Sequence, residues 1–338
     1  MRNGLWVREG TNVDALDASV IVCTYDRCES LSHTLQALAR QQPDPEMRWE
    51  LIVVDNNSRD DTRTVVERFA ASSVIATVRY VFEASQGLSH ARNRGIKEAN
   101  GSVLLFTDDD ARPEPDWIRR VLEGMDQHNC DGCGGYIAPE WEVPPPPWLT
   151  ERFYRYLALR IDRLDTYQVA GTSEVPFGAN MAFRREVFQR IGPFDVTRGR
   201  KGNFLAGGEE IDLFERLLAK GGKVMFFGDV RVYHRIEKSR LTKRYFRRLR
   251  YQSSRNIAQS EDIAGDRRFL GVPLYMFPQF ARACRNAIMA RLSQPRDEAF
   301  HRELIVWHFL GLITGLAASR HCPGKSSNRR PAGTSNRR

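Results

Sequence analysis

The sequence predicts an α/β protein with a mostly parallel sheet, helices on both faces of that sheet and a C-terminal helical extension. Short apolar runs rich in β-branched residues alternate with segments whose apolar residues recur at helical spacing. Such continuous apolar runs are typical of parallel strands that are covered on both sides. Polar residues follow the runs, so a binding edge is expected where the carboxyl ends of the strands meet.

The first half of the chain shows this alternation most clearly. Strands are predicted at residues 18–24, 49–55, 77–82 and 102–107. Helices are predicted between them, at residues 29–41, around Val65, Val66 and Phe69, and at residues 87–101. Because a helix separates each strand from the next, neighbouring strands are expected to run parallel.

The second half begins with a proline-rich connector, "EWEVPPPPWL", at residues 140–149. A strand and a helix are predicted within residues 176–192, and a further helix within residues 207–222. Two more strands are predicted at residues 223–227 and 230–234. The chain is therefore divided into an N-terminal extension (1–17), a main α/β domain (18–236), a basic and apolar helical region (237–320) and a disordered basic tail (321–338).

Composition limits the cellular setting and the kind of partner. The net charge of +9 suits an anionic partner such as a nucleotide, a nucleic acid or an acidic lipid. The six cysteines are too sparse for a secreted disulfide scaffold, and "CDGC" has no second pair with which to form a zinc site. The N-terminus has no apolar signal core, and no stretch reaches the roughly 18 apolar residues that span a bilayer. A cytoplasmic protein is expected.

An acidic triplet, Asp108–Asp110, follows the predicted strand at residues 102–107. Alternate residues of a strand point to the same side, so Asp108 and Asp110 are expected to face one cavity, with Asp109 directed elsewhere or reaching in through a turn. Adjacent carboxylates repel each other unless protons or cations intervene, and their oxygens suit Mg²⁺ or Mn²⁺. Taken alone, the triplet favours a solvated turn slightly over a metal site.

Other polar residues each carry a functional and a structural interpretation. Asp55 can accept a hydrogen bond from a nucleobase or ribose, or it can belong to a turn that caps the next helix. Arg92 suits phosphate recognition or a solvated helix face. Glu209 and Glu210 offer a general base, or they complement the dipole at the start of a helix. His234 ends an apolar strand, either as a structural residue or as a third metal or diphosphate contact.

Five segments of the chain, in their order, resemble the family 2 glycosyltransferases of the GT-A fold. They are "ASVIVCTYDRCESLSHTLQALARQ", "LIVVDNNSRDDT", "GLSHARNRGIKEANGSVLLFTDDDARPEPDWI", "GANMAFRREVFQRIGPFD" and "GGEEIDLFERLLAKGGKV". They lie within residues 18–234, about two thirds of the chain. No single segment is decisive, but five in the right order are specific. The resemblance implies a Rossmann-like, mostly parallel sheet, and it favours the metal interpretation of the acidic triplet.

The resemblance also implies a donor-binding role for several positions. The nucleotide base and ribose would be lined by Thr24, Tyr25, Asp26 and Asp55. Arg92 would hold the nucleotide end of the donor. The sugar and diphosphate would lie beside Gly178 and Asn180.

The acidic triplet would be the DXD-type element of the family, with Mn²⁺ or Mg²⁺ as the cofactor. Asp108 would lie near the ribose and share the metal with Asp110, whereas Asp109 is placed among the donor-binding residues without a specific role. His234 would be a further metal contact, and Arg240 would contact the diphosphate. The metal would bridge the diphosphate and stabilise charge on the leaving nucleotide.

The catalytic base implied by the resemblance is a carboxylate near residue 210. The family commonly carries Gly-Glu-Asp where this chain has Gly208-Glu209-Glu210, so the base becomes Glu210, and the choice between Glu209 and Glu210 stays open. The reaction would be a single displacement that inverts the anomeric centre. The donor would be a nucleotide-diphosphate sugar and the acceptor a carbohydrate or a lipid-linked hydroxyl, in cell-surface polysaccharide or glycolipid synthesis.

Two other functions fit parts of the sequence. A nucleotidyltransferase acting on sugar phosphates would also use paired aspartates, but the turn after the first strand, "TYDRCES", lacks the glycine-rich loop of such enzymes. A nucleic-acid-binding protein would use the basic and aromatic segment at residues 239–255. The acidic edge would repel phosphates unless it held metal, so no nucleic-acid partner is expected.

Two apolar segments near the C-terminus, at residues 277–292 and 303–318, leave a membrane question open. They either pack as core helices or lie on a membrane surface beside basic patches. We favour peripheral association, at the cytoplasmic face of the inner membrane.

Overall fold

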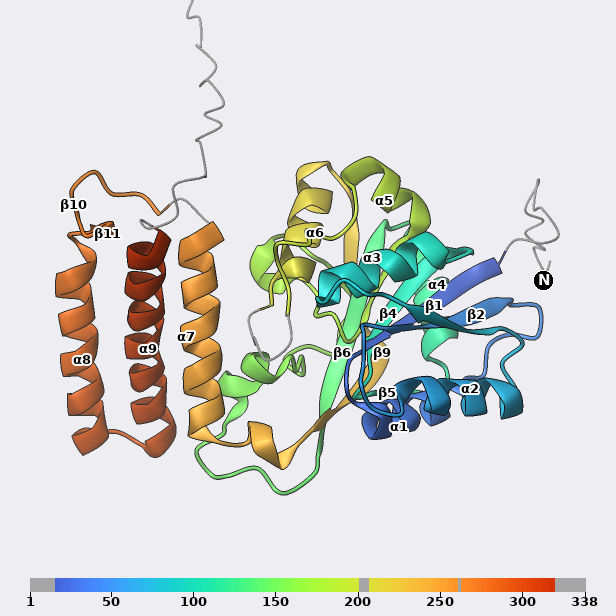
Figure 1. Ribbon diagram of the computed structural model, residues 1–338, viewed down its shortest axis with the longest axis horizontal. Helices are drawn as coiled ribbons and strands as arrows, with labels where there is room; N and C mark the ends of the chain where they lie inside the picture. Colours follow the sequence, from blue (N-terminus) through green and yellow to red (C-terminus); the bar gives the residue numbers. More distant parts are fainter. Residues whose placement is uncertain (1–15, 201–206, 261–262, 320–338) are drawn as a thin grey trace, which may run out of the picture. The chain divides into compact units, whose positions relative to one another are not determined.

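The computed structural model describes residues 16–200, 207–260 and 263–319 (Figure 1), and the chain is divided into two compact units, with the boundary in the sequence between Tyr245 and Phe246. The predicted tail at residues 321–338 lies outside the described residues, as does the predicted N-terminal extension except for its last two residues. Those two, Leu16 and Asp17, are the start of the first strand. The predicted domain boundary after residue 236 stays a prediction.

The first unit is built on one sheet, which has nine strands within the described residues. The strands are β1 (Leu16–Thr24), β2 (Trp49–Asp55), β3 (Val78–Phe82), β4 (Gly101–Asp108), β5 (Ala111–Pro113), β6 (Gly132–Trp141), β7 (Tyr167–Gln168), β8 (Met181–Arg184) and β9 (Val224–Ile236). Their order is β3-β2-β1-β4-β8-β6-β9-β5, with β7 paired to β9. Strands β1 to β4 pair in parallel, as does β6 with β9, whereas β5, β7 and β8 run antiparallel to their neighbours.

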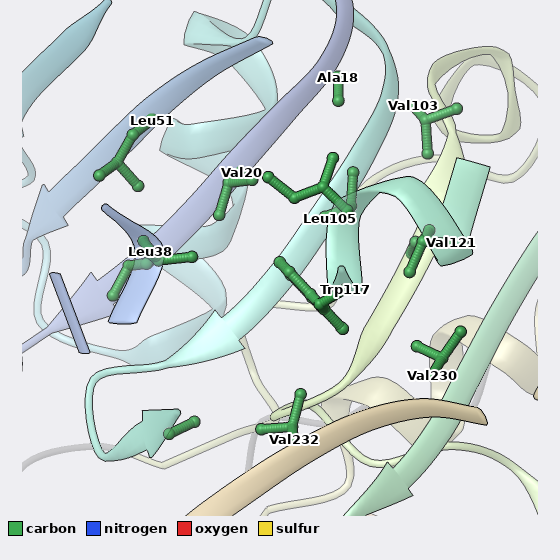
Figure 2. Close-up of a cluster of buried hydrophobic side chains, with 14 of the residues drawn as sticks. Ala18, Val20, Leu38, Leu51, Val103, Leu105, Trp117, Val121, Val230 and Val232 are labelled. Carbon is green, nitrogen blue, oxygen red and sulfur yellow. The ribbon is translucent and has the colours of Figure 1, made fainter. Parts of the chain in front are cut away.

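Helices cover both faces of this sheet, which confirms the predicted fold class. One face packs against α1 (Cys28–Leu38), α2 (Thr62–Ser72) and α4 (Trp117–Gln127), and the other against α3 (Leu88–Glu98), α5 (Arg185–Ile191) and α6 (Glu209–Ala219). Strand β1 shows why both faces are apolar. Val20 and Val22 join the core beneath α1 and α4, shown in part in Figure 2, whereas Ile21 between them joins the core beneath α3 and α6.

Among the longer strands β6 and β9 differ from the sequence prediction, and the short strands β5 and β7 were not predicted. Strand β6 was not predicted because its start, "GCGGY", is rich in glycine, a residue depleted in strands. Glycine is needed here, since a Cβ on Gly134 would lie 2.1 Å from the Cβ of Pro176. Strand β9 is continuous from Val224 to Ile236, although two strands were predicted. Its pairing with β6 resumes after a register shift between Gly135 and Tyr136, so the polar interruption at Gly228 and Asp229 does not end the strand.

The second unit contains the helices α7 (Lys243–Ser260), α8 (Met276–Ser293) and α9 (Arg296–Ser319), and a small hairpin, β10 (Arg268–Phe269) and β11 (Val272–Pro273). Helix α9 packs closely on α7, because a Cβ on Gly315 would lie only 2.7 Å from the Cβ of Ala258. The predicted C-terminal helical extension is therefore confirmed. Of the helices described here, none combines the length and the apolar character needed to cross a membrane.

Candidate active site

A cavity of about 310 Å³ lies at the carboxyl ends of β1 and β4, where the sequence predicted a binding edge. Strands β1 and β4 are neighbours, with Cys23 opposite Asp108, so the turn after β1 and the acidic triplet after β4 meet there. Ten of the predicted site residues line the cavity: Thr24, Tyr25, Arg92, Asp108, Asp109, Asp110, Gly178, Glu209, Glu210 and Arg240. Segments far apart in the sequence are thus brought into one pocket.

A candidate metal-binding cluster includes two residues that line the cavity, Asp108 and Asp110. Asp108, Asp110 and His234 each offer a ligand atom, and these atoms lie within 4.8 Å of one another. The pairing of β5 with β9 places Ala111 opposite His234, which brings the His234 Nε2 atom to 3.1 Å from Asp110 Oδ1. Two carboxylates and an imidazole form a donor set that suits Mn²⁺ or Mg²⁺. The residues present therefore fit a divalent cation.

Asp110 is the most heavily paired carboxylate of the cluster. Its Oδ2 atom accepts hydrogen bonds from Arg27 Nη1 at 2.9 Å and from Arg240 Nη2 at 3.0 Å. Burial opposes ionisation of this carboxyl, but His234 and the two arginines outweigh burial and hold its pKa well below the usual range. Asp110 is therefore ionised, and a cation that binds it competes with two guanidinium groups.

Asp109 has a different environment from its neighbour. It accepts hydrogen bonds from Thr24 Oγ1 at 2.8 Å and from Arg27 Nη1 at 2.9 Å. Burial raises the pKa of its carboxyl to about 7, although Arg27 acts against this rise. Asp109 thus ties the end of β1 to the acidic triplet.

Arg92 and Glu209 form a buried ion pair beside the cluster. Arg92 Nη1, on α3, donates to Glu209 Oε1 at 2.7 Å, and Arg92 Nη2 lies 3.6 Å from Asp108 Oδ1. Gly178 leaves room for this arginine, because a Cβ at that position would lie 2.2 Å from Arg92 Nη2. Glu209 and Asp108 therefore hold the Arg92 guanidinium between them.

Glu210 is a half-buried carboxylate beside this pair, on the first turn of α6. Its Oε2 atom is buried and has no hydrogen-bond partner among the described residues. Burial raises the pKa of the Glu210 carboxyl to about 7, and the negative charge of Glu209 adds to the rise. The cavity thus holds a carboxylate with a free oxygen and a pKa suited to proton transfer near neutral pH.

Three predicted donor-binding residues do not line the cavity and instead hold the loops around it. Asp55 accepts hydrogen bonds from Tyr80 Oη at 2.8 Å and from the Ser58 backbone N–H at 2.9 Å. Asp26 accepts one from the Arg59 backbone N–H. The side chain of Asn180 joins β6, β9 and α4 through Tyr136 O, Val230 O and Trp117 Nε1. A donor-binding role for these three residues stays a prediction.

Three charged residues that the sequence did not indicate also line the cavity: Arg27, Arg200 and Glu237. Arg27 connects the acidic triplet to β9, since its Nη2 atom donates to Glu237 Oε1 at 2.6 Å. A signal was present, because Arg27 directly follows the polar turn after the first strand. Arg200 and Glu237 lie outside the motifs, and only the folded chain brings them to the pocket.

Comparison with known families now decides the class of protein. The model of glycosyl transferase family 2 matches residues 19–192, which is just over half of the chain. The chain belongs to glycosyl transferase family 2. Family membership confirms the resemblance found in the sequence and favours glycosyl transfer over nucleotidyl transfer and nucleic-acid binding.

Individual relatives agree with this assignment of the glycosyltransferase. This chain is 28% identical over 225 residues to the glucosyl-dolichyl phosphate glucuronosyltransferase of Haloferax volcanii, and the match covers 65% of this chain and 70% of the relative. It is 27% identical over 297 residues to the succinoglycan biosynthesis protein ExoM of Rhizobium meliloti, covering 82% of this chain and 91% of the relative.

A solved structure with a similar fold is the mannosyltransferase PcManGT from Pyrobaculum calidifontis, in complex with GDP-Man and Mn²⁺. The TM-score is 0.51 at 20% sequence identity, with 91% of this chain and 76% of the other covered. The likeness supports the GT-A fold.

Proposed function

We propose that this glycosyltransferase moves a sugar from a nucleotide-diphosphate donor to an acceptor hydroxyl, with a divalent cation and with inversion at the anomeric carbon. One observation carries the proposal: a single cavity is lined by Asp108 and Asp110 of the candidate metal cluster and also by Glu210, whose Oε2 atom has no hydrogen-bond partner among the described residues. The first group suits a cation and a diphosphate. The second suits removal of a proton from an acceptor.

The donor diphosphate would lie against the cationic side chains of the cavity. Arg92, Arg240 and Arg27 line it, and guanidinium groups bind phosphate oxygens bidentately. Asp108, Asp110 and His234 would hold Mn²⁺ or Mg²⁺, which when bound neutralises charge on the leaving diphosphate. The similar mannosyltransferase was solved with GDP-Man and Mn²⁺, and a donor and cation of that kind suit this cavity.

The geometry favours Glu210 over Glu209 as the catalytic base. Glu209 Oε1 is bound to Arg92, and ionised Glu209 is needed to balance that buried arginine. The Oε2 atoms of both glutamates are buried without a hydrogen-bond partner among the described residues, but of the two it is Glu209 that pairs with Arg92, so Glu210 can accept a proton from an acceptor hydroxyl. Attack by that hydroxyl from the Glu210 side, opposite the leaving diphosphate, inverts the anomeric configuration.

The remaining predicted residues receive supporting roles. Thr24 and Tyr25 line the cavity at the end of β1, where the nucleotide would bind. Asp26, Asp55 and Asn180 would act by holding the surrounding loops in place. The names of the relatives point to succinoglycan and to a dolichyl phosphate, so we infer a role in polysaccharide or glycolipid synthesis at the cytoplasmic side of a membrane.

A screen of nucleotide-diphosphate sugars for donor hydrolysis tests this proposal. We expect at least one donor to be hydrolysed with Mn²⁺ or Mg²⁺, and the rate to fall to background with EDTA. Once an acceptor is found, NMR of the product is expected to show the anomeric configuration opposite to that of the donor. Hydrolysis that EDTA leaves unchanged would contradict the cation, and a retained configuration would contradict the single displacement.

A further inference from the structure

Helix α8 presents large apolar side chains on its outer side. Phe277, Ile288 and Leu292 are 37%, 63% and 80% exposed, and their spacing of 11 and 4 residues places them on one side of the helix. The opposite side of α8 is buried within its own unit through Met276 and Ala290. Packing inside the unit therefore does not explain the exposed stripe.

The β10–β11 hairpin extends this apolar surface. The ring of Phe269 lies 6.3 Å from the ring of Phe277, centroid to centroid, which joins the hairpin to α8. Phe269 and Leu270 are each 58% exposed, and Leu274 and Tyr275 beside them are 45% and 44% exposed. These residues and the α8 stripe are named here the outer apolar surface.

Leu270 is an unusual choice for its position. It occupies the first place of the two-residue turn with a φ of 50°, followed by Gly271 with a φ of 83°. Asn or Asp usually stands there, since most other residues are disfavoured in the left-handed region. A leucine that is both strained and exposed indicates that its side chain is required at the tip of the hairpin.

Arginines outnumber carboxylates around the outer apolar surface: Arg267 and Arg268 accompany the exposed Asp266 at the hairpin, and α8 carries arginines alone. Between Met276 and Ser293 the charged side chains are Arg282, Arg285 and Arg291, all exposed, with no Asp or Glu. At 100° per residue, Arg291 falls on one side of the apolar stripe and Arg285 on the other. The sequence after α9, residues 320–338, adds six Lys and Arg residues and no acidic residue.

We propose that the outer apolar surface docks on an anionic lipid bilayer, with the hairpin tip and the α8 stripe in the interface and the arginines at the phosphate headgroups. Apolar residues flanked by arginine are the signature of a helix that lies in the membrane plane. Anionic lipid supplies the opposite charge. A second copy of this surface would bring arginines against arginines, which disfavours self-association. Of the two apolar segments near the C-terminus, α9 instead uses its glycines to pack on α7.

Vesicle flotation of the full chain tests the proposal. Wild-type protein is expected to float with vesicles that contain 30% phosphatidylglycerol in phosphatidylcholine, and to bind pure phosphatidylcholine far less. Leu292→Asp is expected to lower the partition coefficient by about tenfold or more, because a buried leucine contributes roughly 1.5–3 kcal/mol. Replacing Arg282, Arg285 and Arg291 by Gln is expected to cost about fivefold each, from about 1 kcal/mol per basic residue.

Val74→Asp is the matched control. Val74 is 84% exposed on the first unit, so it tests the same change of charge and polarity away from the outer apolar surface. We expect Val74→Asp to bind vesicles as the wild type does, and circular dichroism melts to show that both Asp variants are folded. Donor hydrolysis without vesicles is expected to be unchanged in both, which separates this proposal from the proposed function.

Three results would overturn the docking surface. The first is wild-type protein that does not float with anionic vesicles. The second is Leu292→Asp binding as tightly as Val74→Asp. The third is a wild-type dimer in solution that Leu292→Asp converts to a monomer without any effect on vesicle binding, since the surface would then serve a second copy of the chain.

Discussion

Two carboxyl groups that line the same cavity have opposite environments. Asp110 is surrounded by His234, Arg27 and Arg240, and its pKa is held below the usual range. The Glu210 Oε2 atom has no hydrogen-bond partner among the described residues, and burial raises the pKa of this carboxyl to about 7. Environment thus divides the work: one carboxylate stays charged to bind cations, and the other can exchange a proton.

Of the variants that test this comparison, Glu210→Gln is expected to have the largest effect, a loss of sugar transfer. The amide keeps the shape of the side chain but cannot accept the proton, so transfer should fall by about a thousandfold, within the range of a lost general base. Steady-state rates at saturating donor and acceptor measure this. Glu209→Asp serves as a control that keeps a carboxylate for Arg92, and near-normal transfer by Glu210→Gln would remove Glu210 from the chemistry.

Asp110→Asn is expected to affect binding instead. Without the charge of Asp110 the cluster loses a cation ligand, so metal-dependent donor affinity should fall. Mutating a residue that only supports a metal ligand typically lowers metal affinity by about 10- to 100-fold, and we expect a loss of about 100-fold for this ligand itself. Titration calorimetry with donor and Mn²⁺ measures this loss. Unchanged metal-dependent affinity would show that the cation binds elsewhere.

The pH dependence of transfer sharpens the comparison from the Glu210 side. A base with a pKa of about 7 is half ionised at that pH, so the maximal rate should be level above about pH 8, fall to about half at pH 7 and fall about tenfold at pH 6. The cation ligand Asp110 stays ionised over the same range, so a change in donor affinity between pH 6 and pH 8 would report Asp109, whose pKa is also raised to about 7. A rate that is level from pH 5.5 to pH 8 would assign the base to a carboxyl with an ordinary pKa.

Arg27→Ala is expected to have the smallest effect, and it should strengthen cation binding where Asp110→Asn weakens it. Arg27 competes with a cation for Asp110, so its removal should tighten the binding of Mn²⁺ in the absence of donor. We expect an increase of about fivefold in affinity, or about 1 kcal/mol, which is a fraction of the interaction energy between two charges near a protein surface. Mn²⁺ titration followed by electron paramagnetic resonance measures this. Weaker Mn²⁺ binding in Arg27→Ala would mean that the arginine organises the site and does not compete for it.

The parts of the fold that could be predicted from the sequence are those in which local patterns and tertiary packing agree. β1, β2 and β4 have continuous apolar runs because both of their faces are buried, and their ends carry the polar residues of the cavity. β6 could not be predicted, since its glycines are selected by close approach to Pro176 and Val230, which are distant in the sequence.

The site followed the same logic. The acidic triplet and Glu210 belong to local motifs, so the sequence could identify them. The division between Glu209 and Glu210 could not be predicted, because it depends on Arg92 reaching across from α3 to one of two adjacent carboxylates. The positions of Arg27 and Glu237 depend on the pairing of distant strands, which leaves no local pattern.

Donor affinity in the Glu210→Gln and Glu209→Gln variants, measured by calorimetry with Mn²⁺, tests the central claim most directly. If Glu210 is the base and Glu209 holds Arg92, Glu210→Gln will bind donor as the wild type does while transferring no sugar, and Glu209→Gln will bind donor more weakly. Weakened donor binding by Glu210→Gln, together with normal binding and no transfer by Glu209→Gln, would contradict the account and move the base to Glu209.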